Sequence, residues 1–301
     1  MIRLGTRGSA LALAQARWVA DRLPGEVELV PITTSGDTRP AGAAAEVSDK
    51  SRFVKEIEEA LLAGKVDLAV HSAKDVPSEL PEGLAIVGVP ERADARDALC
   101  GADAIGDLAE GAVIGTASLR RRAALLALRP DLEVRDLRGN VDTRLRRLAD
   151  GEFAAIVLAQ AGLERLGRSG EGAPIDVKRF VPAAGQGCLV LEARADDEGV
   201  GETAEALTEA DALMCLSAER ALVQALDASC HTPIGAHAVT VDGTLRLCAF
   251  VGLPDGSHWI RDELEGEPAE PAALGAAVGE RLLGVGAAAL LAEAERAVAA
   301  G

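Results

Sequence analysis

Short apolar runs alternate with amphipathic stretches along roughly the first 190 residues of this chain of 301 residues. The apolar runs predict strands, and apolar residues at helical spacing between them predict helices. Gly64, Pro130 and Gly151 mark three of the helix ends. Such alternation is typical of parallel sheets covered on both faces. The predicted strands are 2–5, 27–33, 66–70, 84–89, 112–115, 132–137 and 153–158.

The pattern changes towards the C-terminus. A run over 188–194 has no helix partner and is expected to return to the first sheet. A long helix over 210–226 is followed by hairpin signals at Asp242-Gly243 and Asp255-Gly256, and by an Ala-rich helix from about 270. We therefore expect two α/β domains and a small α+β C-terminal domain. Their predicted bounds are 1–92 with about 187–206, then 93–186, then 207–301.

Composition narrows the class of protein. A hydrophobic fraction of 49% with 26% charged residues is typical of a globular enzyme. Met1 leads straight into a strand, and no apolar run reaches the ~20 residues that span a bilayer, so we expect a cytoplasmic protein without a membrane partner. Five scattered cysteines and four histidines show neither a disulfide framework nor zinc spacing, so no metal is expected. A net charge of −17 argues against nucleic acid as a binding partner.

The strand over 66–70 runs directly into a polar turn that contains Ser72, Lys74 and Asp75 and ends at Pro77. In open α/β sheets, ligands bind beyond the carboxyl ends of the strands. This turn is therefore a candidate site. The alternative is a solvated turn with a local ion pair.

Cations and hydroxyls follow other predicted strands in the same way. Guanidinium groups bind carboxylates bidentately, and free N–H groups at helix N-termini accept anions. Because no GxxxxGK[ST] loop is present, carboxylates are favoured over phosphates. The pattern predicts an anion-binding cleft between two α/β units, with a solvated face as the alternative. The residues are Arg7, Ser9, Thr116, Ser118, Arg120, Arg121, Arg138, Arg144 and Arg165.

Two residues stand apart from this basic set. Asp75 would stabilise a developing cation or move a proton, unless it only holds Lys74 or Arg120 in place. Cys230 lies in a predicted loop, next to His231 and before Pro233, and is a candidate covalent attachment point. The other four cysteines fall in apolar runs and are expected in the core.

Several motifs in fixed order resemble the porphobilinogen deaminase (hydroxymethylbilane synthase) family over essentially the whole chain. Each motif is weak alone, but the ordered set is specific. The motifs are Thr6-Arg7-Gly8-Ser9 with Gln15, His71-Ser72-Ala73-Lys74-Asp75-Val76-Pro77, Gly115-Thr116-Ala117-Ser118-Leu119-Arg120-Arg121, Leu137-Arg138-Gly139-Asn140-Val141 with Thr143-Arg144, Ala161-Gly162-Leu163 with Arg165, Gly185-Gln186-Gly187, and Cys230-His231-Thr232-Pro233-Ile234-Gly235.

The resemblance implies two domains like type II periplasmic binding proteins around a cleft, plus the third domain. It implies a dipyrromethane cofactor joined by a thioether to Cys230. A monomeric transferase would add four porphobilinogen units head to tail, release ammonia each time, and use water to release hydroxymethylbilane. Asp75 would be catalytic by stabilising the cation that ammonia loss creates.

The resemblance also assigns binding residues. Those implied for the cofactor, besides Asp75 and Cys230, are Ser72, Lys74, Thr116, Ser118, Arg120, Arg121, Arg138, Gly139 and Arg144. Those implied for the substrate are Arg7, Ser9, Gln15, Lys50, Phe53, Arg165 and Gln186.

The predicted lid over 38–51, which contains Lys50, departs from the family pattern. Ser48-Asp49 stand where Gly-Gly is common, and Glu46 stands where lysine is frequent. Ala228-Ser229 likewise replace a frequent Gly-Gly before Cys230. A non-catalytic two-lobed anion- or solute-binding protein remains the alternative, although such a protein would need neither Cys230 nor a third domain.

Overall fold

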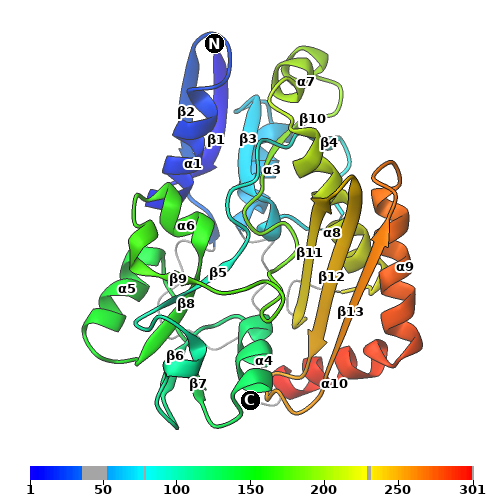
Figure 1. Ribbon diagram of the computed structural model, residues 1–301. Coiled ribbons are helices and arrows are strands. Elements are labelled where there is room, and N and C mark those ends of the chain that lie inside the picture. The colour runs from blue at the N-terminus through cyan, green and yellow to red at the C-terminus, as the bar shows by residue number, and fades with distance from the viewer. Residues whose placement is uncertain (36–52, 78, 229–231, 300–301) are drawn as a thin grey trace. The chain divides into compact units, whose positions relative to one another are not determined.

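The computed structural model describes residues 1–35, 53–77, 79–228 and 232–299 (Figure 1). The chain forms two compact units. The first unit is Met1–Ala93 with Gly187–Leu213, and the second is Asp94–Gln186 with Met214–Gly301. The predicted lid over 38–51 lies outside the described residues.

The first unit is built on a five-stranded sheet with the order β2-β1-β3-β10-β4. Strand β1 pairs in parallel with β2 and β3, whereas β10 is antiparallel to both of its neighbours. The predicted return of this strand to the first sheet is confirmed, and its antiparallel direction corrects the prediction of a parallel sheet to a mixed one. Residues 94–186 of the second unit separate β4 from β10, so no single crossover helix joins β10 to a neighbour and imposes a parallel direction. The strands are β1 (Ile2–Arg7), β2 (Val27–Ile32), β3 (Leu68–Ser72), β4 (Leu84–Gly88) and β10 (Leu189–Arg194).

Helices cover both faces of this sheet. Successive strand residues point to opposite faces, so Leu68 packs in a core with α1 and α7, while Ala69 packs in another with α3. A one-turn 3-10 helix, η2, follows β3 directly. The helices are α1 (Ala10–Ala20), α3 (Lys55–Leu62), η2 (Ala73–Asp75) and α7 (Glu198–Glu205).

The second unit contains a sheet with the equivalent order, β7-β6-β8-β5-β9. Strand β5 takes the place that β10 has in the first sheet and is antiparallel to β8 and β9. Both sheets therefore have the arrangement expected for type II periplasmic-binding-protein domains. Sequence patterns missed β5, because four residues are too few for a clear alternation. The strands are β5 (Asp97–Cys100), β6 (Val113–Gly115), β7 (Glu133–Arg135), β8 (Ala155–Ala159) and β9 (Ala173–Pro174).

Three helices alternate with the strands of this sheet along the chain. They are α4 (Leu119–Leu128) after β6, α5 (Val141–Ala149) after β7 and α6 (Gln160–Arg165) after β8. Ser118 caps α4 by accepting a hydrogen bond from the Arg121 N–H, and Asn140 caps α5 in the same way from Thr143. Short 3-10 turns, η3 (Ile105–Asp107) and η4 (Ser169–Glu171), complete the connections.

The C-terminal part of the second unit is an antiparallel three-stranded sheet, as predicted (Figure 1). Asp242 and Gly243 form the first hairpin turn with positive φ angles of 50° and 78°. One sheet face packs against α8, α9 and α10, and the other contacts α4 through Phe250 and Leu125. The elements are α8 (Ala210–Ala225), β11 (Ile234–Val241), β12 (Thr244–Gly252), β13 (Trp259–Gly266), α9 (Pro271–Gly284) and α10 (Ala287–Ala299).

The final Ala-rich segment is two helices and not the predicted one. The break falls at Gly286, whose φ of 100° is compatible with glycine and strained for other residues. Within the described residues, no single helix is long and apolar enough to cross a membrane; α9 and α10 reach that length only as a pair bent by 78°.

Candidate active site

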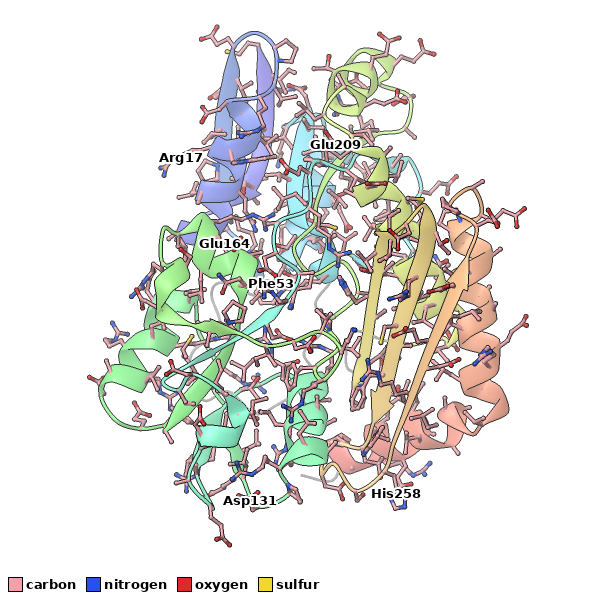
Figure 2. The ribbon with its side chains drawn as sticks, in the orientation of Figure 1. Arg17, Phe53, Asp131, Glu164, Glu209 and His258 are labelled. Carbon is pink, nitrogen blue, oxygen red and sulfur yellow. The ribbon has the colours of Figure 1, made fainter. Side chains whose placement is uncertain are left out.

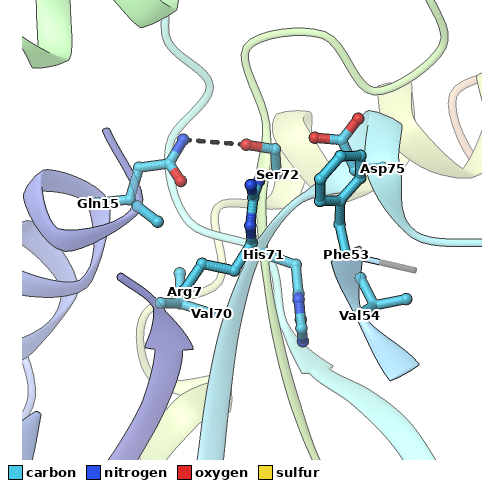
Figure 3. Close-up of a pocket in the computed structure, with 9 residues that line it drawn as sticks. Arg7, Gln15, Phe53, Val54, Val70, His71, Ser72 and Asp75 are labelled. Carbon is cyan, nitrogen blue, oxygen red and sulfur yellow. Dashed lines mark hydrogen bonds between the residues drawn. The ribbon is translucent and has the colours of Figure 1, made fainter. Parts of the chain in front are cut away.

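A pocket opens in the first unit where β1 and β3 end at the same edge of the sheet. Arg7 is the last residue of β1 and Ser72 the last of β3. The start of α1 and the residues before α3 complete the wall (Figure 3). Parallel strands bring residues that are far apart in the sequence to one edge in this way. The lining residues are Arg7, Ala12, Gln15, Phe53, Val54, Val70, His71, Ser72 and Asp75.

The polar groups of the pocket are held by side-chain contacts. Gln15 is buried and donates a hydrogen bond from Nε2 to Ser72 Oγ at 3.0 Å. The guanidinium carbon of Arg7 lies 4.2 Å from the centre of the Phe53 ring, a cation–π contact worth about 0.5–1 kcal/mol. Phe53, labelled in Figure 2, lies two residues before the start of α3 at Lys55. These contacts orient Arg7 and Ser72 towards a shared space.

Asp75 stands on the turn η2 between β3 and Pro77. The Ala73 N–H donates to the Cys188 carbonyl at 3.0 Å, and the Val76 N–H donates to the Ala73 carbonyl at 3.2 Å. The turn is thus tied to the segment that leads into β10, while Asp75 itself stays partly exposed. A carboxylate on a rigid, accessible turn can face a cation that forms in the pocket.

Two residues predicted for this region do not line the pocket. The Ser9 hydroxyl accepts a hydrogen bond from the Ala12 N–H at 3.3 Å and so caps α1. Lys74 is half-buried in η2 beside Asp75. The predicted residues that the structure does bring together are Arg7, Gln15, Phe53, Ser72 and Asp75.

In the second unit, a buried carboxylate organises three of the predicted binding residues. Asp97 accepts from Arg121 Nε at 2.9 Å and pairs with Arg120 at 2.7 Å. Gln186 Nε2 donates to the same carboxylate at 3.0 Å and to the Ala95 carbonyl at 2.8 Å. All four side chains are almost fully buried. Sequence reasoning missed Asp97, although a lone acidic residue directly before the apolar run 98–100 was a signal.

The electrostatics of this cluster are strongly coupled. Burial alone would raise the pKa of the Asp97 carboxyl, but the charges of Arg120 and Arg121 outweigh burial and hold that pKa below its ordinary value. One carboxylate cannot neutralise two guanidinium groups, so the cluster keeps a positive charge. Arg120 and Arg121 also donate to the carbonyls of Val181 and Val157, each at 2.8 Å.

The remaining predicted residues of the second unit lie near the ends of its helices, most of them around the starts of α4 and α5. Thr116 Oγ1 accepts from the Ser118 N–H at 3.2 Å, and this fixes the turn into α4. Arg144 Nε donates to the Gly139 carbonyl at 2.8 Å, and Gly139 has a φ of 110° that favours glycine. Arg138 is half-exposed, 3.5 Å from Asp136. Arg165 is partly exposed at the end of α6.

Two predicted residues, Lys50 and Cys230, lie outside the described residues.

Comparison with family models matches residues 2–202 to "Porphobilinogen deaminase, dipyromethane cofactor binding domain" and residues 213–284 to "Porphobilinogen deaminase, C-terminal domain". The porphobilinogen deaminase of Syntrophobacter fumaroxidans is 46% identical over 99% of both chains. That of Deinococcus radiodurans is 47% identical over 96% of this chain and 97% of its own length. The chain belongs to the porphobilinogen deaminase family.

A periplasmic substrate-binding protein of an ABC transporter from Coxiella burnetii also aligns, at 17% identity and a TM-score of 0.42, covering 69% of this chain and 92% of its own.

Membership of the porphobilinogen deaminase family establishes the activity. The chain is a transferase that makes hydroxymethylbilane from porphobilinogen by stepwise condensation with release of ammonia. Its cofactor is dipyrromethane. The non-catalytic solute-binding alternative is not favoured by these matches.

Asp97→Asn should lower the free energy of unfolding at pH 7 by about 3–5 kcal/mol, because it leaves two buried guanidinium groups without their counter-ion. Asp94→Asn is the control. Asp94 pairs with Arg96 nearer the surface, so its loss should cost less than about 1 kcal/mol. Urea unfolding of both variants measures this, and equal losses would contradict the structural role of Asp97.

The same variant has an expected pH dependence. Because the folded-state pKa of Asp97 lies below its ordinary value, its stabilisation is complete above about pH 4 and is lost as the pH falls further. The gap in unfolding free energy between wild type and Asp97→Asn should therefore shrink in strong acid.

Arg138→Leu should weaken cofactor or substrate binding by about 1.5–3 kcal/mol without unfolding the protein, because its half-exposed guanidinium can pair with a ligand carboxylate. Arg146→Leu is the matched control, an exposed arginine on the neighbouring helix α5. The KM for porphobilinogen and the cofactor content measured by mass report the difference. Equal, mild effects at both positions would remove Arg138 from the binding residues.

Proposed function

We propose that Asp75 is the catalytic residue of the condensation. The observation that carries this proposal is its position, an accessible carboxylate on a rigid turn in the same pocket as Arg7. Loss of ammonia from porphobilinogen leaves a cation on the pyrrole. The Asp75 carboxylate would stabilise this cation and accept hydrogen bonds from pyrrole N–H groups.

The carboxylates of the rings need cationic partners, and each unit supplies some. Every ring carries an acetate and a propionate, so the growing chain is a polyanion. Arg7 is the cation in the Asp75 pocket. In the second unit, the two positive charges of Arg120 and Arg121 face the single negative charge of Asp97. Arg138 is half-exposed. The other proposed ligand contacts are those of Ser9, Gln15, Lys50, Phe53, Ser72, Lys74, Thr116, Ser118, Gly139, Arg144, Arg165 and Gln186.

The residues present fit an anionic dipyrromethane. Asp97 is buried between two guanidinium groups, which leaves a surplus cation for a ligand carboxylate. When bound, the cofactor would supply a nucleophilic pyrrole end that serves as the primer. Arg120 and Arg121 would bind primer carboxylates, while Ser118 orients the start of α4 by capping it.

Cys230 is the proposed attachment point of the cofactor. The other cysteines, Cys100, Cys188, Cys215 and Cys248, are buried thiols. Burial raises the pKa of the Cys100 thiol to about 11 and also raises that of Cys248, so neither supplies a reactive thiolate. A thioether holds the primer through successive additions and survives the hydrolysis that releases the product.

The mass of the purified protein tests this proposal. It should exceed the mass of the sequence by two pyrrole units, and the added mass should map to the peptide that contains Cys230. Aldehyde reagent in acid should also colour the protein, as it does pyrroles. An active protein with the bare sequence mass would contradict the proposal, and so would added mass on another peptide.

The domains, the cellular compartment, the oligomeric state and the partners complete the proposal. The chain would have three domains, at 1–92 with about 187–206, 93–186 and 207–301, the first carrying Asp75 and the third Cys230. It would act as a cytoplasmic monomer on small molecules, without a nucleic-acid or membrane partner. The net charge of −17 and the burial of Cys100, Cys188, Cys215 and Cys248 as thiols support this assignment.

A further inference from the structure

A buried cluster of ionisable side chains lies behind the strand that leads to Asp75. His71 Nε2 and Glu192 Oε2 are 3.1 Å apart, and their side chains are only 3% and 1% exposed. Glu58, 7% exposed on α3, is the third member, because the charges of both Glu192 and His71 act on its carboxyl. His71 also lines the pocket, but the reaction proposed above assigns no step to any of these three residues.

Strand register explains why the three side chains meet. His71 lies opposite Val190, and Glu192 lies opposite Ala69, so His71 and Glu192 share one face of the sheet. Ala69 packs in the core that contains α3 residues Ile57 and Leu61, so this is the face that α3 covers. In Figure 3 the His71 ring points away from Ser72, which lies on the opposite face.

The polar atoms of the cluster form few hydrogen bonds although they are buried. His71 Nε2 and Glu192 Oε2 are close but not aligned for a hydrogen bond, and Glu192 Oε1 and Glu58 Oε1 are buried with no hydrogen-bond partner among the described residues. Two carboxylates beside one imidazole are costly in a low-dielectric interior. Burial, followed by the negative charge of Glu192, raises the pKa of Glu58 to about 7, and His71 only partly opposes this rise.

Other charged groups on the surrounding elements do not neutralise the cluster. On α3, Glu59 raises the pKa of Glu58 a little further, and Glu56 accepts a hydrogen bond from the Ser35 N–H. On β10, Arg194 pairs with Asp197 at 2.7 Å and donates to two backbone carbonyls. The cluster therefore gains a negative charge when Glu58 ionises.

Helix α3 connects this cluster to the pocket. Phe53 and Val54 line the pocket and directly precede α3, which begins at Lys55. Phe53 also holds Arg7 by the cation–π contact at 4.2 Å. A charge placed under α3 opposes the packing of that helix and adds a negative potential behind Arg7.

We propose that His71, Glu192 and Glu58 form a buried proton-holding cluster that positions α3, Phe53 and Arg7, and that sets how tightly the pocket binds anionic substrate. These are positioning residues, and the proposal rests on the proposed function of the Asp75 pocket. When Glu58 is protonated, α3 packs closely and the pocket accepts the substrate carboxylates. When Glu58 ionises, binding weakens while the chemistry at Asp75 is unchanged.

Steady-state ammonia release between pH 5.5 and pH 9 tests this inference in the holoenzyme. In wild type, the KM for porphobilinogen should rise by roughly fivefold or more as the pH passes through neutrality. Glu58→Gln should abolish this rise and leave kcat within about twofold of wild type, because glutamine mimics the protonated acid. Glu59→Gln is the matched control, with a side chain that is 63% exposed on the same helix, and should retain the rise.

A second variant and a second measurement separate this role from a merely structural one. Glu192→Gln removes a charge that raises the pKa of Glu58, so the rise in KM should move to lower pH. A measurement that does not depend on activity is the unfolding midpoint. The midpoint of Glu58→Gln minus that of wild type should become more positive as the pH rises from 5 to 8.5. A raised folded-state pKa means that protonated Glu58 stabilises the protein in acid and that this stabilisation is lost towards neutrality.

A KM profile for Glu58→Gln that matches wild type, or an unfolding midpoint difference independent of pH, would overturn the inference. Failure of the proposed function would look different, because Asp75→Asn would then release ammonia at nearly the wild-type rate, whatever the pH profiles of the Glu58 and Glu59 variants.

Discussion

Asp75→Asn should fold like wild type and lose on the order of a thousandfold or more in kcat for ammonia release. The asparagine amide has nearly the shape of the carboxylate but carries no charge. It therefore cannot stabilise the cation that forms when ammonia leaves. Arg7 and the Gln15–Ser72 hydrogen bond remain in the pocket, so substrate binding should change far less than turnover.

Single-turnover and steady-state ammonia release, with porphobilinogen binding measured separately, check this prediction. Glu82→Gln is the control, an exposed carboxylate in the same unit that does not line the pocket. It should behave as wild type. Near-wild-type steady-state release by Asp75→Asn would remove Asp75 from the catalytic role.

Cys230→Ala should give a folded protein with the bare sequence mass and no condensation activity. Without the thiol there is no thioether and hence no retained primer. The cationic groups that pair with the primer's carboxylates would then lose these partners. Arg120 and Arg121, whose two positive charges Asp97 only half neutralises, are among these cationic groups. The variant should therefore also unfold at lower urea concentration than the holoenzyme, because a tightly bound group stabilises only the folded state.

Intact-mass spectrometry, ammonia release and urea unfolding of the same preparation check these three expectations. Cys100→Ala is the control, because Cys100 is a fully buried thiol of the second unit. It should keep the added mass and the activity. An active Cys230→Ala protein, or one that retains the added mass, would show that the primer is held elsewhere.

The sequence by itself determined most of the elements and the chemical character of the residues at their ends. Hydrophobic periodicity is a local property, so it identified the strand over 66–70, the return of 188–194 and the hairpin at Asp242-Gly243. Strand ends are also local. Because parallel strands share an edge, Arg7 and Asp75 could be expected together, and the structure places both in one pocket.

Only the tertiary structure decided which partners these elements and side chains take. The direction of β5 and β10 depends on where the chain enters each sheet, which no local pattern encodes. Arg120 and Arg121 were predicted as ligand cations, but their shared partner Asp97 lies more than twenty residues away in the chain. The His71–Glu192 pair likewise depends on strand register. Burial and pairing arise from contacts between distant segments, and these exist only after the chain has folded.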